Sequence, residues 1–282
     1  MHLLTLNLDM KNDNLISSMN SDSMEQLVLV IGGSDSSGGA GIQADIKSIT
    51  VQGAYAASAI TSITSQNTQG VQEIFDLPTD LIVSQIDSVI SDLDIKVIKI
   101  GMLNNIDLIR FISKQLKTMQ LVVDPVMVAT SGDVLVSQKV IGIMKDMLFQ
   151  NAEIITPNLA EAEVLSGVKI NNEKDQLTAA KELLKLGSKY VLVKGGHLEG
   201  EIIKDILVTN DYEEYFEHKK VSTENTHGTG CTLASSIAAK LAQDIPMKTA
   251  VKESIDFVVS LLSTSPKVGR GNGPLVHGVK LN

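Results

Sequence analysis

From Leu27 onward, short apolar stretches alternate with segments whose apolar residues recur at helical spacing. The apolar stretches are not interrupted by regularly placed polar residues, which is typical of strands covered on both faces and therefore of parallel sheets. Successive strand and helix units place such a sheet between layers of helices. The sequence therefore predicts an α/β fold with three layers around a central, mostly parallel sheet. We expect strands at residues 27–32, 95–102, 121–126, 153–156, 190–195 and 203–209.

Two parts of the chain depart from this alternation. Residues 54–75 are dense in Ala, Ser, Thr and Ile and predict short strands that form a small β flap. Residues 1–23 are rich in Asn, Ser and Asp, and we expect a disordered extension there, with Met24 as an alternative start. No repeat or linker follows, so residues 24–282 are predicted to form one domain.

Composition excludes several classes of function. The formal net charge of -9 disfavours nucleic-acid binding, which needs clustered Lys and Arg. The mean hydropathy is +0.14, and no apolar stretch reaches the roughly 20 residues that span a bilayer, so we expect no membrane partner. The single cysteine, Cys231, excludes an intramolecular disulfide and favours a cytoplasmic location.

The first motif is a glycine-rich turn at residues 32–41, between an apolar strand and a helix. Its glycines allow the backbone to approach a ligand closely, although a tight turn without a ligand is an equally good interpretation. It lacks the Gly-Lys-Ser/Thr of a Walker-type phosphate loop. Asp45, one turn into the helix, is either close to a cleft or a solvated helix position.

The second motif, at residues 225–232, leads directly into an alanine-rich helix. Gly228, Thr229 and Gly230 would direct backbone N–H groups at one point, where the helix dipole adds positive potential and makes an anion hole. Cys231 in the first turn would have a lowered pKa in that field and could act as a base or nucleophile, unless it is an inert buried residue. His227 by itself is better interpreted as a capping or packing residue.

A third group of polar residues follows the predicted strands. The carboxyl ends of strands are where open α/β sheets bind ligands, so these side chains are expected at one edge. Carboxylates there would hold Mg²⁺, and a lysine would neutralise a phosphate. Each also has a purely structural interpretation, as a turn residue, a helix cap or a strand-end charge. The group consists of Asp124, Asn158, Glu161 and Lys194.

Five motifs, in order, resemble the hydroxymethylpyrimidine and phosphomethylpyrimidine kinase family. They are Gly-Ser-Asp-Ser-Ser-Gly-Gly-Ala-Gly-Ile-Gln-Ala-Asp at 33–45, Ser-Gln-Asn-Thr at 65–68, Lys-Ile-Gly-Met-Leu at 99–103, Asp-Pro-Val-Met-Val at 124–128 and His-Gly-Thr-Gly-Cys-Thr at 227–232. The resemblance extends from about Leu27 to the Gly269–Pro274 segment. It implies a ribokinase-like fold, a homodimer, and ATP-dependent phosphorylation of a small pyrimidine and then of its monophosphate.

The resemblance also implies residue roles. The pyrimidine would be held by Gly33, Asp45 and Gln66, with Met102 packing nearby. Cys231 would take the place of the base aspartate of related sugar kinases, and the amides of Gly228, Thr229 and Gly230 would stabilise the transferred phosphoryl group. Asn158 and Lys194 are expected near the nucleotide, and Glu161 and Asp124 near Mg²⁺.

Two positions depart from the family pattern, and three alternatives stay open. Ser36 stands where proline is common, and Thr130 stands where many members have lysine, which affects the second phosphorylation. A pyridoxal kinase would use the same chemistry on another flat heteroaromatic alcohol. A non-catalytic binding protein on the same fold would be expected to lack Cys231 or the metal acids. A Rossmann oxidoreductase is disfavoured by the glycine spacing.

Overall fold

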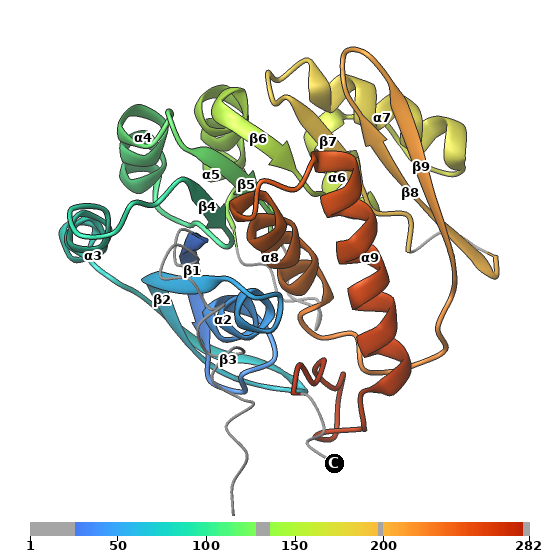
Figure 1. Ribbon diagram of the computed structural model, residues 1–282, viewed down its shortest axis with the longest axis horizontal. Coiled ribbons are helices and arrows are strands. Elements are labelled where there is room, and N and C mark those ends of the chain that lie inside the picture. The colour runs from blue at the N-terminus through green and yellow to red at the C-terminus, as the bar shows by residue number, and fades with distance from the viewer. Residues whose placement is uncertain (1–25, 128–135, 197–199, 279–282) are drawn as a thin grey trace, which may run out of the picture.

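The computed structural model describes residues 26–127, 136–196 and 200–278. Within them one sheet has the strand order β3-β2-β1-β4-β5-β6-β7-β8-β9 (Figure 1). The pairings from β2 through β1 to β7 are parallel, while β3, β8 and β9 join antiparallel at the two edges. The strands are β1 (Leu27–Asp35), β2 (Tyr55–Asn67), β3 (Gly70–Asp76), β4 (Val97–Ile100), β5 (Gln120–Val123), β6 (Ala152–Ile155), β7 (Tyr190–Val193), β8 (Ile202–Val208) and β9 (Glu213–Lys219).

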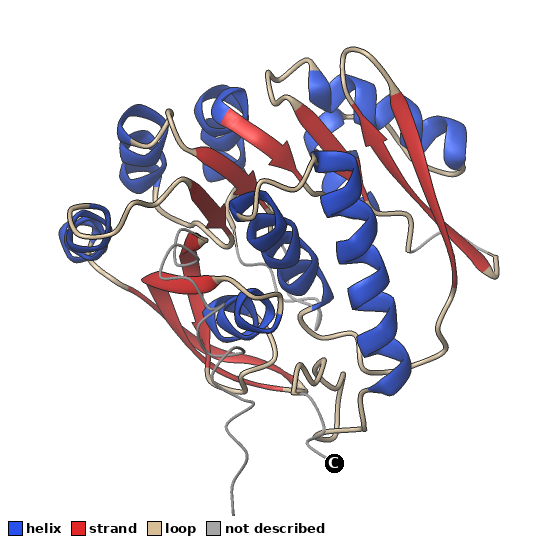
Figure 2. Cartoon of the chain, in the orientation of Figure 1, coloured by secondary structure: helices blue, strands red, loops and turns tan. Residues whose placement is uncertain are grey.

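Helices cover both faces of this sheet (Figure 2). One apolar core packs α3, α4, α5, α6 and α7 on one face, and a second packs α2, α8 and α9 on the other. The helices are α2 (Gly41–Val51), α3 (Thr79–Ile90), α4 (Ile106–Gln115), α5 (Gln138–Ile143), α6 (Leu159–Ser166), α7 (Glu173–Leu184), α8 (Thr229–Ala242) and α9 (Met247–Thr264). A π turn at Met144–Leu148 and a 3-10 turn at Phe149–Asn151 continue α5.

Strand β1 shows why the central strands are rich in consecutive apolar residues. Leu29 and Ile31 point into the first core, while Val28 and Val30 point into the second. Because successive side chains alternate between faces, a strand between two helix layers must be apolar at every position. The predicted three-layer α/β fold is confirmed.

The six predicted strands correspond to β1, β4, β5, β6, β7 and β8, with small differences at their ends. Strand β1 continues three residues beyond Gly32, to Asp35. The flap exists as the antiparallel β2–β3 hairpin, but β2 also pairs along β1 and is part of the main sheet. Strand β9 was not predicted, because Glu, Lys and His surround its one buried residue, Phe216.

Two sequence expectations concern residues that the structure does not describe, and a third, on membrane association, is tested only in part. The extension at residues 1–23 and Thr130 lie outside the described residues. Across the described ranges, no helix combines the length and the apolar character needed to cross a membrane.

Candidate active site

The carboxyl ends of the central parallel strands and the start of α8 meet at one place. Asp124 follows β5 and Lys194 follows β7, 70 residues further along the chain. A Cβ added to Gly230 in α8 would be 3.3 Å from both Asp124 Oδ2 and Lys194 Nζ. The structure therefore brings together the second and third groups of residues predicted from the sequence, at the edge of the sheet where α/β proteins bind ligands.

Two helices begin at this place rather than one. Gly228 precedes α8 with a φ of 82°, and a Cβ there would overlap the carbonyl oxygen of Gly39. The backbone N–H of Gly41, the first residue of α2, lies close enough to Cys231 in α8 to lower the pKa of its thiol, although burial outweighs this effect. The positive dipole ends of both helices thus meet at a common point, where the N–H of Thr229 is already paired with the Thr226 carbonyl oxygen at 3.4 Å. Such a point attracts an anion, as the glycine-rich motifs predict.

The predicted lowering of the Cys231 pKa is wrong. Burial raises the pKa of the Cys231 thiol to about 12; Lys99 opposes this shift, and the carboxylates of Asp45 and Asp124 add to it. The helix field favours the thiolate, but the desolvation of a buried thiolate and the two nearby carboxylates outweigh it. In the protein without ligands Cys231 is therefore a neutral thiol at physiological pH.

Asp124, Lys194 and Glu161 form a compact charged group. Lys194 Nζ is 3.3 Å from Asp124 Oδ1, which also accepts a hydrogen bond from Thr156 Oγ1 at 3.3 Å. Burial raises the pKa of Glu161 to about 7; Lys194 opposes this rise and the Asp124 carboxylate adds to it. Burial alone would lower the pKa of Lys194, but the Asp124 and Glu161 carboxylates raise it. Lys194 therefore stays charged and faces the anion hole.

Asn158 and Glu161 also have a clear structural task. Asn158 Oδ1 accepts the N–H of Glu161 at 2.9 Å, and Glu161 Oε2 accepts the N–H of Asn158 at 2.8 Å. This reciprocal pair is a capping box that starts α6. It is the structural alternative that the sequence left open, and the nucleotide and metal roles of these two residues stay predictions.

The acidic side chains near Lys194 are compatible with a magnesium ion. Among the described residues, no three His, Cys, Asp or Glu side chains form a metal-binding group. Mg²⁺, however, is commonly held by one or two carboxylates together with water and substrate phosphates. Asp124 and Glu161 supply two carboxylates of this kind. Burial is the main cause of the raised pKa of Glu161, and a cation would relieve the repulsion that Asp124 adds to it.

Asp45 lies in a buried ion pair beneath the site. Lys99 Nζ is 2.7 and 2.9 Å from the two carboxylate oxygens of Asp45, and Ser235 Oγ donates to Asp45 Oδ1 at 2.7 Å. Both charged side chains are fully buried. Asp45 therefore joins β4 to α2 and α8, and its predicted contact with a pyrimidine stays a prediction.

The predicted ring-binding residues are near one another. A Cβ on Gly33 would be 2.8 Å from Met102 Cε and 2.9 Å from Ser62 Oγ. Gln66, from the end of β2, lies beside the loop that follows β1, where Ser36 Oγ both donates to its carbonyl and accepts from its N–H at 2.8 Å. Gly33 is thus needed for close packing, and Ser36 ties Gln66 to the glycine-rich loop.

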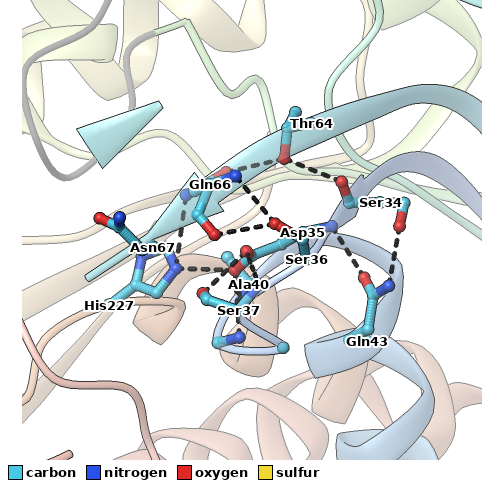
Figure 3. A network of polar contacts seen from close by, with 12 residues as sticks. Ser34, Asp35, Ser36, Ser37, Ala40, Gln43, Thr64, Gln66, Asn67 and His227 are labelled. Carbon is cyan, nitrogen blue, oxygen red and sulfur yellow. Dashed lines mark hydrogen bonds and ion pairs between the residues drawn. The ribbon is translucent and has the colours of Figure 1, made fainter. Parts of the chain in front are cut away.

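Sequence reasoning missed three residues with prominent roles. Lys99 was quoted only as part of a motif, although a lysine within an apolar strand is itself unusual. Asp35 ends β1 as Asp124 follows β5, but it was not singled out. His227 was interpreted as a packing residue, yet its Nε2 is 2.8 Å from Asp35 Oδ2 (Figure 3).

This fold, with paired helix starts beside a charged strand edge, defines a ribokinase-like small-molecule kinase. The chain belongs to the phosphomethylpyrimidine kinase family, whose model matches residues 35–276. It is 41% identical over 259 residues to a hydroxymethylpyrimidine/phosphomethylpyrimidine kinase of Rhizobium meliloti, covering 90% of this chain and 97% of that protein. The resemblance predicted from the five motifs is confirmed.

Solved structures give the same family relationship. A phosphomethylpyrimidine kinase from Clostridium difficile is 41% identical with a TM-score of 0.73, covering 83% of this chain and 98% of that chain. A Bacillus subtilis pyridoxal kinase in complex with ADP is 33% identical with a TM-score of 0.83, covering 89% and 97%. The chain spans only about half the length of two bifunctional thiamine-biosynthesis relatives that it matches.

Proposed function

We propose that this chain transfers the γ-phosphoryl group of ATP to the hydroxymethyl oxygen of 4-amino-5-hydroxymethyl-2-methylpyrimidine. It then phosphorylates the resulting monophosphate to the pyrophosphate, a route that supplies the pyrimidine half of thiamine. The names of the relatives in R. meliloti and C. difficile support this choice of substrate. The observation that carries it is the meeting of two helix N-termini at Cys231, beside Lys194 and Asp124.

Each part of the site has a task in this transfer. The pyrimidine ring is bound and oriented by Gly33, Asp45, Gln66 and Met102, and contacts with Lys99 and Ser235 hold Asp45 in place. The N–H groups of Gly228, Thr229 and Gly230 stabilise the charge that develops on the transferred group. Lys194 and Asn158 contact the nucleotide, and a magnesium ion held by Asp124 and Glu161 would offset phosphate charge.

Cys231 is the proton acceptor in this proposal. Its position in the first turn of α8 places the sulfur where the two helix starts meet. The thiolate form of Cys231 takes the proton of the hydroxymethyl O–H and becomes a thiol as the oxygen attacks phosphorus in line and the bond to the leaving ADP breaks. Lys99, which is buried close by, favours the thiolate that must be present before this transfer.

The first test is phosphoryl transfer by the purified full chain. With Mg-ATP we expect the hydroxymethylpyrimidine to give its monophosphate and then its pyrophosphate. Phosphorus NMR measures both products. Addition of a chelator in excess of magnesium should stop both steps. Loss of only the second step would agree with Thr130 in place of the lysine of the family pattern. No transfer to any acceptor would favour a binding protein and contradict the proposal.

Pyridoxal phosphorylation is the second candidate function. Its support is the TM-score of 0.83 to the B. subtilis pyridoxal kinase, which exceeds the 0.73 to the C. difficile phosphomethylpyrimidine kinase. Sequence identity favours the pyrimidine, at 41% against 33%. Pyridoxine and pyridoxal therefore belong in the same assay. A higher kcat/KM for either vitamin than for the pyrimidine would move the chain to this second function.

We also propose that residues 24–282 act as one cytoplasmic kinase domain that forms a homodimer. The flap offers a surface for pairing, because Ile63 and Phe75 face each other across β2 and β3 and are 49% and 63% exposed. Light scattering should give twice the chain mass for the wild type and the chain mass for Phe75→Glu. Wild-type protein that is monomeric at micromolar concentration would rule out the dimer.

A further inference from the structure

The loop after β1 is folded around the carboxylate of Asp35. Asp35 Oδ1 accepts the N–H and the hydroxyl of Ser37, both at 2.8 Å. Its Oδ2 accepts the N–H groups of Gly39 and Ala40 at 3.0 and 2.8 Å. Figure 3 shows these donors gathered around a single side chain. The path of the loop between β1 and α2 is therefore set by this carboxylate.

One more donor comes from a distant part of the chain. His227 Nε2 is 2.8 Å from Asp35 Oδ2, although 192 residues separate the two residues in sequence. Both residues are buried, and the His227 ring packs so closely that a Cβ on Gly39 would overlap it. His227 directly precedes Gly228, which begins the anion-binding turn. The contact thus links the loop after β1 to the turn before α8.

The same loop is linked on its other side to Gln66. Ser36, next to Asp35, holds both backbone groups of Gln66 through its hydroxyl. A continuous path therefore runs from Gln66 through Ser36, Asp35 and His227 to Gly228. One end of this path carries a predicted ring-binding side chain, and the other carries the predicted phosphoryl-binding turn.

The protons of this network can be assigned. Burial alone would raise the pKa of Asp35, but hydrogen bonds from His227, Ser37 and Ala40 outweigh it and lower the pKa to about 2. Asp35 is therefore an ionised acceptor, and His227 Nε2 must carry a hydrogen. Gln66 Nε2 lies 3.5 Å from the same nitrogen, and two donors cannot bond to each other. The amide hydrogens of Gln66 are thus not taken by His227.

We propose that His227 is a positioning residue whose hydrogen bond to Asp35 sets the distance between the bound acceptor and the phosphoryl-binding turn. The proposal rests on the kinase function above. In the proposed function the pyrimidine contacts Gln66 and ATP contacts Lys194, and His227 is assigned to neither ligand. Its loss should therefore leave both ligands bound but misaligned, and a displacement of about 1 Å can cost on the order of 100-fold in rate.

The test compares His227→Ala with His227→Gln. We expect the alanine variant to lose on the order of 100-fold in kcat while KM for the pyrimidine and for ATP stays within about twofold. Glutamine places an N–H near the position of His Nε2, so its kcat should be within about fivefold of wild type. His218→Ala is the matched control, because His218 also contacts a carboxylate, Asp205 at 3.5 Å, and should keep wild-type kcat.

A second readout does not depend on any substrate. Hydrogen exchange in a peptide covering residues 35–41 should be about tenfold faster in His227→Ala than in wild type, and unchanged in His227→Gln. Equal loss of kcat in both variants, or a raised KM with normal kcat, would overturn the positioning role. If wild-type protein phosphorylates none of the acceptors, the kinase function fails, and unchanged exchange in His227→Ala would separately overturn the link.

Discussion

Replacing Lys99 with methionine is expected to lower the free energy of unfolding by about 3–5 kcal/mol. Methionine fills a similar volume but leaves the Asp45 carboxylate, which is fully buried, without its cation. Burial alone would lower the pKa of Lys99, but Asp45, Cys231 and Asp124 raise it, so the lysine is held charged. Urea denaturation at neutral pH measures the change.

Two further variants separate this effect from a simple loss of charge. Lys252 pairs with Asp256 on the surface, with both side chains more than half exposed, so Lys252→Met should cost only about 0–1 kcal/mol. Adding Asp45→Asn to Lys99→Met removes the uncompensated charge and should recover much of the stability. If the urea midpoint of Lys99→Met equals that of the wild type, the Lys99–Asp45 ion pair does not stabilise the fold.

The architecture was largely predictable because it depends on a repeated local pattern. Residues 27–31 of β1 and residues 191–193 of β7 are all apolar since both faces of these strands are covered, and that property is visible in a short stretch of sequence. Strand β9 was missed because only Phe216 is buried there, so an edge strand looks like a charged loop. Local patterns thus identify the centre of the sheet better than its edges.

The site was predictable where a residue follows a recognisable strand or starts a recognisable helix. Asp124, Lys194 and Cys231 satisfy this condition, and the structure brings them together. The contacts of Lys99 with Asp45 and of His227 with Asp35 join segments 54 and 192 residues apart. No local pattern reports such pairings, since they depend on how the layers pack.

The Lys99–Asp45 and His227–Asp35 pairs both lie close to the start of α8. Lys99 is close enough to Cys231 to lower the pKa of its thiol. Asp35 orders the loop that contains Gly39, against which Gly228 packs. The anion hole is therefore made by two helix starts whose separation is fixed by pairings between side chains of different motifs. Preorganised donors of this kind stabilise a transition state because they need no rearrangement when charge develops.

Replacing Cys231 with alanine is expected to lower kcat by about 10²–10⁴-fold, the range typical of a lost general base. The residue is half-buried and its side chain is small, so folding should be little changed, and near-identical urea midpoints would verify this. Thr229→Ser is a matched control in the same turn, because serine retains the hydroxyl that donates to the Thr226 carbonyl. A kcat for Cys231→Ala close to wild type would exclude the thiol as the base.

The pH dependence of kcat/KM gives a second test of Cys231 as the base, because that ratio reports the pKa values of the free enzyme. A thiol with a pKa of about 12 is protonated at neutral pH, so wild-type kcat/KM should keep rising through pH 9 without reaching a plateau. The alanine variant should lack this rise. A wild-type plateau near pH 7 would instead mean that the two helix starts outweigh burial and the nearby carboxylates, as the helix field alone predicts. The pH profile therefore decides whether desolvation or the helix field has the larger effect on the pKa of Cys231.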